Sequence, residues 1–167
     1  ADLTLPGMVY AAVRVSPVAG GRVVRLGDTR ARGASGVLDV VRLEGGVAVV
    51  AKGWWQAQTA LGLLELDFDG GAIAASTDSI DAALHSGVSE DGRVVREVGD
   101  VEAALHGCAR VLEWEYKVPY LAHATMEPMS CVASVEGDRC TVWAPTQGPT
   151  VAHAAAAKAA GVPPENV

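Results

Sequence analysis

The sequence is short of basic and aromatic residues, and it contains no long apolar run. Its 167 residues include 13 Lys and Arg against 20 Asp and Glu, which gives a formal net charge of −7. Nucleic-acid binding requires a basic face, often with aromatic side chains among the charges, and the sequence has no such patch. No window approaches the roughly 18 consecutive apolar residues that indicate a membrane-spanning helix. A nucleic-acid partner and a transmembrane segment are therefore not expected.

Cysteine is also scarce, and common catalytic motifs are absent. The three cysteines Cys108, Cys131 and Cys140 are too few and too scattered for a disulfide framework, a zinc site or an iron–sulfur site. We expect them to be buried small hydrophobic residues, although a Cys131–Cys140 bond across a hairpin stays open. The four histidines show no metal-ligand spacing, and the dinucleotide-binding, P-loop and serine-hydrolase motifs are missing.

The first 70 residues predict a small α/β unit with more strand than helix. Half of all residues in the chain are hydrophobic, so a real core is possible, in one compact domain or two small ones. In residues 53–63 the pattern has helical spacing, and Trp54 is expected to fill the seam between this helix and the sheet. The β-prone runs predicted as strands are 8–15, 22–26, 37–41, 47–52 and 64–69.

Beyond residue 70 the predicted elements are shorter. Residues 109–118 predict a strand, because apolar positions such as Trp114 and Tyr116 alternate with charged ones. The predicted helices are 76–84, capped by Thr77 or Asp78, 101–106, capped by Asp100, and 150–160, ended by Gly161. The remaining predictions are a turn at 87–92, an extended run at 93–98, an irregular segment at 119–129 and a hairpin of 131–135 with 140–143. The ends suggest a piece of a longer polypeptide, with a strand expected after residue 167.

The loop at 144–150 is the first segment that could carry chemistry. Pro149 suits the first turn of a helix, and a helix start offers N–H groups and a partial positive charge to an anion. The Gln147 amide can donate and accept hydrogen bonds, and Gly148 lets a ligand approach the backbone. Two interpretations stand. The loop binds an anionic group such as a phosphate or a metal-bound oxo group, or it is an ordinary strand–turn–helix junction with Gln147 facing solvent.

A second cluster is the segment 123–129, with the sequence HATMEPM. Glu127 precedes a proline, which favours an extended backbone. Its position between Met126 and Met129 predicts partial burial, and hence a partner or a raised pKa. The alternative is a loop glutamate paired with a nearby arginine or a backbone N–H.

At these two clusters the chain resembles the molybdenum-binding subunits of the xanthine dehydrogenase and aldehyde oxidase superfamily. Within it, the isoquinoline 1-oxidoreductase type of large (beta) subunit is the most similar. The order and spacing of several segments carry the resemblance, and no single motif decides it. These segments are 5–14, 16–17, 46–51, 54–57, 64–69, 99–104, 116–120, 123–129 and 143–147.

The resemblance implies an α+β fold in three parts. An α/β-hammerhead-like domain would span residues 1–70, a connector 71–118, and the start of a mixed α/β molybdopterin-binding domain 119–167. Gln147 would lie near the molybdenum and donate a hydrogen bond to an oxo ligand, with Thr146 and Gly148 as further cofactor-binding candidates. Met126 and Glu127 would belong to the wall of the site. No catalytic residue or metal ligand is expected here, because the family's glycine-rich cofactor loop and its general-base glutamate are absent.

For the longer protein, the resemblance implies hydroxylation of an aldehyde or an N-heterocycle with water as the oxygen source. The expected cofactor is molybdopterin in its cytosine dinucleotide form. The expected partners are the rest of the large subunit, a small iron–sulfur subunit and a small-molecule substrate. The chain alone is expected to be inactive and to bind no cofactor. Substrate identity and compartment, bacterial cytoplasm or periplasm, stay open.

Two alternatives remain for this chain. It could be a non-catalytic packing or interaction module, which exposed apolar surface around Trp54, Trp55 and the alanine-rich last helix would favour. It could also be an unrelated α/β ligand-binding domain, which a complete closed sheet would favour.

Overall fold

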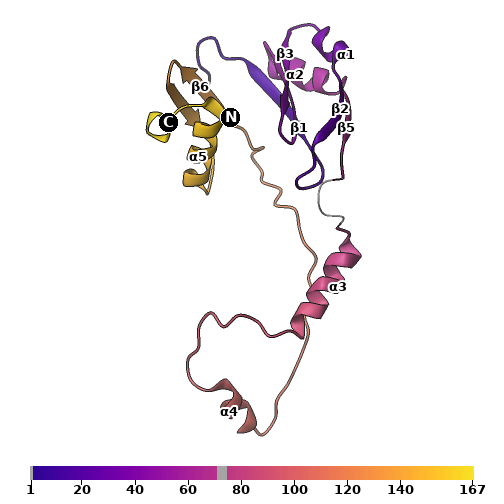
Figure 1. Ribbon diagram of the computed structural model, residues 1–167, viewed down its shortest axis with the longest axis vertical. Helices are drawn as coiled ribbons and strands as arrows, with labels where there is room; N and C mark the ends of the chain where they lie inside the picture. Colours follow the sequence, from indigo (N-terminus) through magenta and orange to yellow (C-terminus); the bar gives the residue numbers. More distant parts are fainter. Residues whose placement is uncertain (1, 71–74) are drawn as a thin grey trace. The chain divides into compact units, whose positions relative to one another are not determined.

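The computed structural model describes residues 2–70 and 75–167, and it is a mixed α/β structure with three small sheets (Figure 1). The chain divides into two compact units. The N-terminal unit is Leu5–Gly99, and the C-terminal unit is Asp100–Val167 together with the first four residues. The start of the predicted connector, residues 71–74, lies outside the described residues. Within the described ranges, no helix is both long and apolar enough to cross a membrane.

The main sheet of the N-terminal unit has three antiparallel strands in the order β1-β4-β3. They are β1 (Tyr10–Val15), β3 (Val37–Leu43) and β4 (Gly46–Ala51). The central strand β4 reads GVAVVA, and almost all of it is buried. A strand covered on both faces has no polar side to alternate with, which explains its continuous apolar run.

A second, two-stranded sheet pairs β2 (Val23–Gly27) with β5 (Glu65–Phe68). The helix α2 (Trp54–Leu61) packs on β1 and β4, and the short α1 (Thr29–Arg32) packs on β3. The five strands of this unit and α2 were predicted from the sequence within a few residues. The core is made mostly of Val and Ala, with Val47 and Val49 as its largest fully buried side chains.

The predicted role of Trp54 is wrong. The side chains with which α2 meets the sheet are Ala57, Ala60 and Leu61, all buried. Trp54 and Trp55 are 51% and 71% exposed, with ring centroids 5.6 Å apart. They occupy the first turn of α2, before the helix reaches its line of contact with the sheet. The small alanines let the helix lie close to the strands, which leaves no seam of indole size to fill.

Two helices follow, α3 (Thr77–Val88) and α4 (Val101–His106). The cap of α3 is Ser76, not Thr77 or Asp78, because Ser76 and Ser79 exchange side-chain to backbone hydrogen bonds of 3.1 and 2.9 Å. The helix continues four residues beyond the predicted end, through Gly87. The cap of α4 is Asp100, as predicted, and its carboxylate accepts from the N–H of Ala103 at 2.9 Å.

Residues 109–118 form no strand, contrary to prediction. Trp114 and Tyr116 are 64% and 87% exposed, and no described strand pairs with this segment. An alternating pattern shows which faces a strand would have, but a strand exists only when a neighbour pairs with it. The irregular segment 119–129 is found as predicted.

The C-terminal unit contains the predicted hairpin of β6 (Val132–Glu136) and β7 (Arg139–Trp143), then α5 (Pro149–Ala160) and a 3₁₀ turn at Pro164–Asn166. Gly137 has a φ of 62°, which suits the first central position of a two-residue type II′ turn. Gly161 ends α5 in the left-handed conformation, with a φ of 70°.

The cysteines follow the prediction only in part. Cys140 is buried, whereas Cys108 and Cys131 are exposed, and all three thiols are free. Cys140 lies opposite Val135 in the hairpin, so Cys131 is not its cross-strand neighbour. The possible Cys131–Cys140 bond is therefore not formed.

Candidate functional site

The predicted cofactor-binding residues lie together in one turn between β7 and α5. The N–H of Gly148 donates a hydrogen bond of 3.0 Å to Oγ1 of Thr146. This bond closes a small turn around Gln147, whose side chain is exposed. The structure thus brings Thr146, Gln147 and Gly148 to the entrance of the last helix, where the sequence predicted them.

The start of α5 gives this turn its electrostatic character. Pro149 has no N–H, and the first bond within the helix runs from the N–H of Ala152 to the carbonyl of Gly148 at 3.0 Å. The N–H groups of Thr150 and Val151 therefore belong to the first turn, where a helix leaves its donors without intrahelical acceptors. The first turn of α5 carries no acidic residue. These donors and the Gln147 amide suit negatively charged oxygen atoms.

Gly148 is not required by the backbone geometry. It has a φ of −118°, and a Cβ at this position would lie 3.8 Å from the Cβ of Val151, an ordinary contact distance. Alanine would therefore fit the fold at this position. What glycine provides is open space beside the backbone, which a ligand can use.

Met126 and Glu127 lie in a separate, irregular segment. Both are exposed, so the predicted partial burial of Glu127 is wrong for this chain. The hydroxyl of Thr125 donates to the backbone carbonyl of Glu127 at 2.7 Å, which fixes the local backbone but not a pocket. Burial requires a neighbouring element on top of the segment, and flanking methionines cannot supply one.

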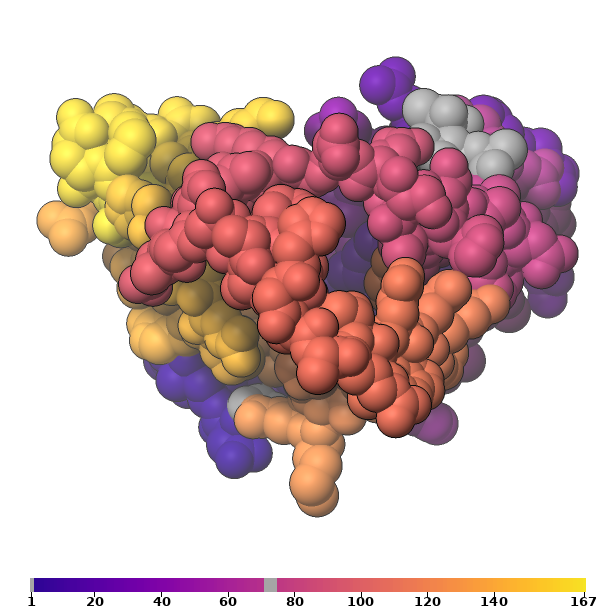
Figure 2. Space-filling model, turned by 90° about the horizontal axis from the view of Figure 1, so that it is seen from below, coloured from indigo at the N-terminus to yellow at the C-terminus, as the bar shows by residue number. Residues whose placement is uncertain are grey.

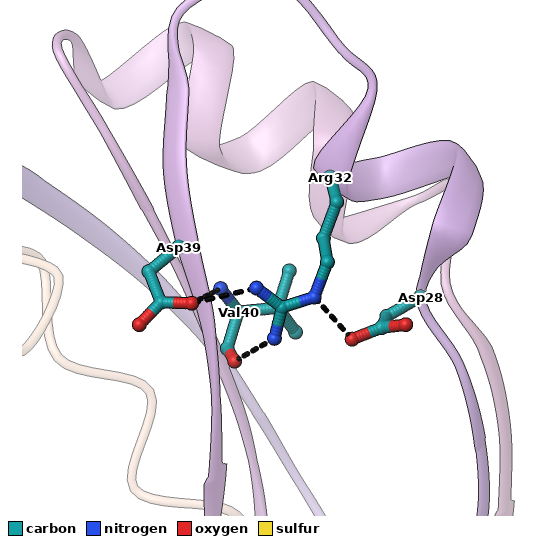
Figure 3. Close-up of polar contacts among 4 residues, drawn as sticks. All are labelled: Asp28, Arg32, Asp39 and Val40. Carbon is teal, nitrogen blue, oxygen red and sulfur yellow. Dashed lines mark hydrogen bonds and ion pairs between the residues drawn. The ribbon is translucent and has the colours of Figure 1, made fainter.

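Sequence reasoning missed a network of charges in the N-terminal unit (Figure 3). The guanidinium of Arg32 donates to the carboxylates of Asp28 and Asp39 at 2.6 and 2.7 Å, and to the carbonyl of Val40 at 2.7 Å. The hydrogen bond from Arg32 lowers the pKa of Asp39, and both carboxylates raise the pKa of Arg32. The i,i+4 spacing of Asp28 and Arg32 was the available signal. This network joins α1 to β3 and is structural.

The described residues contain no further built site. Two open surface hollows, of about 630 and 440 Å³, lie near the start of β2. The larger is lined by charges of both signs, including Arg22, Arg42 and Asp69, which favours no one class of ligand. No cluster of three or more His, Cys, Asp or Glu in the described ranges is arranged to hold a metal ion.

Residues 84–167, about half of the chain, match the family model of the molybdopterin cofactor-binding domain. The chain belongs to this family. The matched residues include both predicted clusters, the Gln147 turn and the Met126–Glu127 segment. The resemblance found in the sequence is thereby confirmed.

Two curated relatives give the family match its context. The chain is 28% identical, over 177 residues, to the isoquinoline 1-oxidoreductase subunit beta of Brevundimonas diminuta, covering 99% of this chain and 23% of that protein. It is 27% identical, over 188 residues, to the aldehyde oxidoreductase molybdenum-binding subunit PaoC of Escherichia coli (strain K12), covering 97% of this chain and 25% of that protein. The chain thus spans about a quarter of the length of these relatives.

The fold agrees with the family. The crystal structure of quinoline 2-oxidoreductase from Pseudomonas putida 86 matches with a TM-score of 0.68 at 20% sequence identity, over 99% of this chain and 26% of that chain. The likeness therefore covers both units and the long segments between their regular elements.

Proposed function

We propose that this chain is part of the large, molybdopterin-binding subunit of a molybdenum hydroxylase. The enzyme would oxidise an aldehyde or an N-heterocycle, with water as the source of oxygen. The observation that carries the proposal is the family match over residues 84–167. The relatives support the reaction class, because one is named for isoquinoline and the other for aldehyde oxidation.

We propose a division of the chain into three parts. Residues 1–70 would form an α/β-hammerhead domain, residues 71–118 a connector, and residues 119–167 the start of the cofactor-binding domain. The sheet of β1, β3 and β4 with α2 packed on it supports the first assignment.

The turn of Thr146, Gln147 and Gly148 fits the cofactor by its chemistry. Its exposed amide and the N–H groups at the start of α5 are hydrogen-bond donors, and no acid in that first turn opposes an anion. We assign Gln147 the role of donating a hydrogen bond beside the molybdenum. Thr146 holds the turn, Gly148 leaves the backbone accessible, and Met126 and Glu127 contribute to the wall of the site. When bound, the molybdopterin cofactor supplies the redox chemistry, and these residues bind and orient it.

This chain is not expected to act alone. A cofactor of this size needs enclosing walls, and one exposed turn offers a single side. The remaining walls would come from the rest of the large subunit. The names of the relatives identify them as subunits, which supports an assembly of several chains. We assign the iron–sulfur clusters to a small partner subunit and the cytosine dinucleotide form to the cofactor.

The N-terminal unit favours a second role, as a packing module. Trp54 and Trp55 present two large exposed rings on α2, and an exposed aromatic pair marks a surface that another element can cover. In the enzyme this role is compatible with the first, since the unit would support the cofactor-binding domain without touching the cofactor. The sheets are open, so the closed sheet of an independent ligand-binding domain is not found among the described residues.

The molybdenum content of the natively expressed protein tests the proposal. Elemental mass spectrometry is expected to find about one molybdenum per chain, because the cofactor carries the reaction. Gln147→Ala should lower the content or the oxidation rate, whereas Gln58→Ala, an exposed glutamine on α2, should change neither. If the protein is purified from a host that makes the cofactor and contains no molybdenum, the enzyme assignment is rejected.

A further inference from the structure

The middle of the chain exposes nearly all of its surface. From residue 75 to residue 131 no side chain is buried, and only Asp81 is half-buried. More than half of the exposed large hydrophobic side chains in the described ranges lie here. Figure 2 shows this stretch, coloured from magenta to orange, with its side chains open to solvent. An apolar surface of this extent marks a contact that the chain does not make by itself.

One part of this stretch has the pattern of a half-buried strand. From Leu112 to Val118, apolar and charged residues alternate without exception, in the sequence LEWEYKV. Leu112, Trp114, Tyr116 and Val118 would share one face, and they are 56%, 64%, 87% and 82% exposed. Pro119 follows and has no N–H for a ladder, so a strand would end at Val118.

The helix α3 also has an exposed apolar face, here with helical spacing. Ile80, Leu84 and Val88 fall four residues apart and form one apolar stripe, yet α3 buries no residue. A single helix of this length is marginal in water without an element to pack against. The strand pattern and the helix stripe therefore both require a covering surface.

The other elements of the C-terminal unit leave the apolar residues of 112–118 exposed. Its buried residues are Cys140 and Ala157, a very small core for the hairpin and α5. A two-stranded hairpin is marginally stable at best without further strands or a packed helix. The unit thus has the elements of a domain but lacks most of its interior.

We infer that Leu112–Val118 is a β-strand in the assembled enzyme, with its apolar face docked on the remainder of the large subunit. This inference rests on the proposed function, since the surface that would cover the apolar face is assigned to the rest of the same large subunit. Two observations favour that occupant. The chain spans only about a quarter of its relatives, and the fold likeness to quinoline 2-oxidoreductase covers 99% of the chain, including this segment. The extended course of the segment is therefore part of a fold in which most of the polypeptide lies outside this chain.

Hydrogen exchange followed by mass spectrometry tests the inference on the natively purified protein and on the 167-residue chain. Peptides covering residues 112–118 should exchange at least about a hundredfold more slowly in the native protein, because paired amides open only with local unfolding. Equal, fast exchange in both samples would overturn the inference. It would also be overturned if the 167-residue chain showed the protection and had a dimer mass by light scattering, since the occupant would then be a second copy.

A pair of variants tests which face of the strand at 112–118 is docked. In the native protein, Trp114→Lys should abolish the protection, whereas Glu113→Lys, on the opposite face, should keep it. If Trp114→Lys gives no soluble protein, the isosteric Val118→Thr should still reduce the protection, and full protection there would count against the docked face. Molybdenum measured on the same samples separates the two proposals. Slow exchange without molybdenum would support the strand at 112–118 and reject the proposed enzyme. Molybdenum without slow exchange would support the enzyme and reject the strand.

Discussion

Gly148 and Thr146 are linked across Gln147 by a hydrogen bond of 3.0 Å from the Gly148 N–H to the Thr146 Oγ1. The bond ties Thr146 to the residue that caps the start of α5. It also determines what Gln147 can do, because a side chain at the centre of a closed turn points outward. The candidate site is therefore held by one hydroxyl group, which makes it simple to test.

Thr146→Val removes this acceptor while keeping the shape of the side chain. Loss of one such hydrogen bond costs about 0.5–1.5 kcal/mol, so the molybdenum content or oxidation rate of the native protein should fall up to about tenfold. Thr146→Ser keeps the hydroxyl and should behave like the parent. The midpoint of thermal unfolding should fall only slightly, because the hydrogen bond lies in an exposed turn. Equal cofactor content in the valine and serine variants would show that the turn plays no part in binding.

Gly148→Ala separates an effect on folding from an effect on the approach of a ligand to the backbone of the turn. A Cβ at this position would meet only Val151, 3.8 Å from its Cβ and 3.9 Å from its Cγ2, so the stability of the chain should change by no more than about 0.5 kcal/mol. Cofactor binding should weaken if a ligand approaches the backbone there. Denaturant unfolding and molybdenum content are measured on the same preparation. Unchanged molybdenum with unchanged stability would mean that the ligand does not pass this side of the turn.

Local patterns were enough to predict most regular elements. The strands of the N-terminal unit, the helix α2 and the later hairpin followed from residue periodicity, and Asp100 and Gly161 marked helix ends through their own chemistry. The cap of α3 was harder to predict, because Ser76, Thr77 and Asp78 are consecutive residues that can all cap a helix, and the reciprocal bonds of Ser76 with Ser79 decide between them. These features depend on a few neighbouring residues, and the sequence contains them all.

The failures share one physical cause. The strand expected at residues 109–118, the partial burial expected of Glu127 and the packing expected of Trp54 each depend on a neighbour that is distant in sequence or outside this chain. A periodic pattern tells which face would be buried, but not what buries it. The candidate site follows the same rule. The turn around Gln147 was predictable, whereas the walls of a cofactor site were not.

The corrected packing of α2 can be checked by stability. Leu61 is 3% exposed, and Leu61→Ala should cost about 2–5 kcal/mol, since it leaves a cavity between helix and sheet. Trp55 is 71% exposed, and Trp55→Gln should change the free energy of unfolding by no more than about 0.5 kcal/mol. Urea unfolding of the chain followed by circular dichroism compares them. A larger loss for the tryptophan variant would restore its predicted place in the seam.

Gly46 marks a close approach of strands β1 and β4. A Cβ there would lie 2.4 Å from the carbonyl oxygen of Arg14, so Gly46→Ala should push the strands apart and cost about 1–3 kcal/mol. The neighbouring Gly45→Ala is the matched control, because its Cβ would lie 3.5 Å from the carbonyl of Gly21, an ordinary contact. The same urea experiment applies. Equal midpoints for the two variants would contradict the tight pairing of β1 with β4.

The hydrogen bond between Arg32 and Asp39 predicts a pH dependence of stability. Arg32 lowers the pKa of Asp39 below its usual value of 3.8, chiefly through the 2.7 Å hydrogen bond, so the folded state holds the carboxylate in its charged form. A lowered pKa in the folded state means stabilisation that is fully present above pH 3.8 and is lost as the pH falls through the folded-state pKa. Asp39→Asn should therefore be less stable than the parent at neutral pH, and the difference should shrink in acid.

Asp91→Asn, at an exposed aspartate after α3, is the control for the charge change itself. Urea midpoints measured from neutral pH down to acid should give a gap between parent and Asp39→Asn that closes with falling pH, and a flat, small gap for Asp91→Asn. A constant gap for Asp39→Asn would mean that shape or backbone contacts, such as the bond from the Val40 N–H to its carboxylate, stabilise the fold without help from the charge. Because Arg32 also donates to Asp28, the double variant Asp28→Asn with Asp39→Asn should lose more than either single variant at neutral pH.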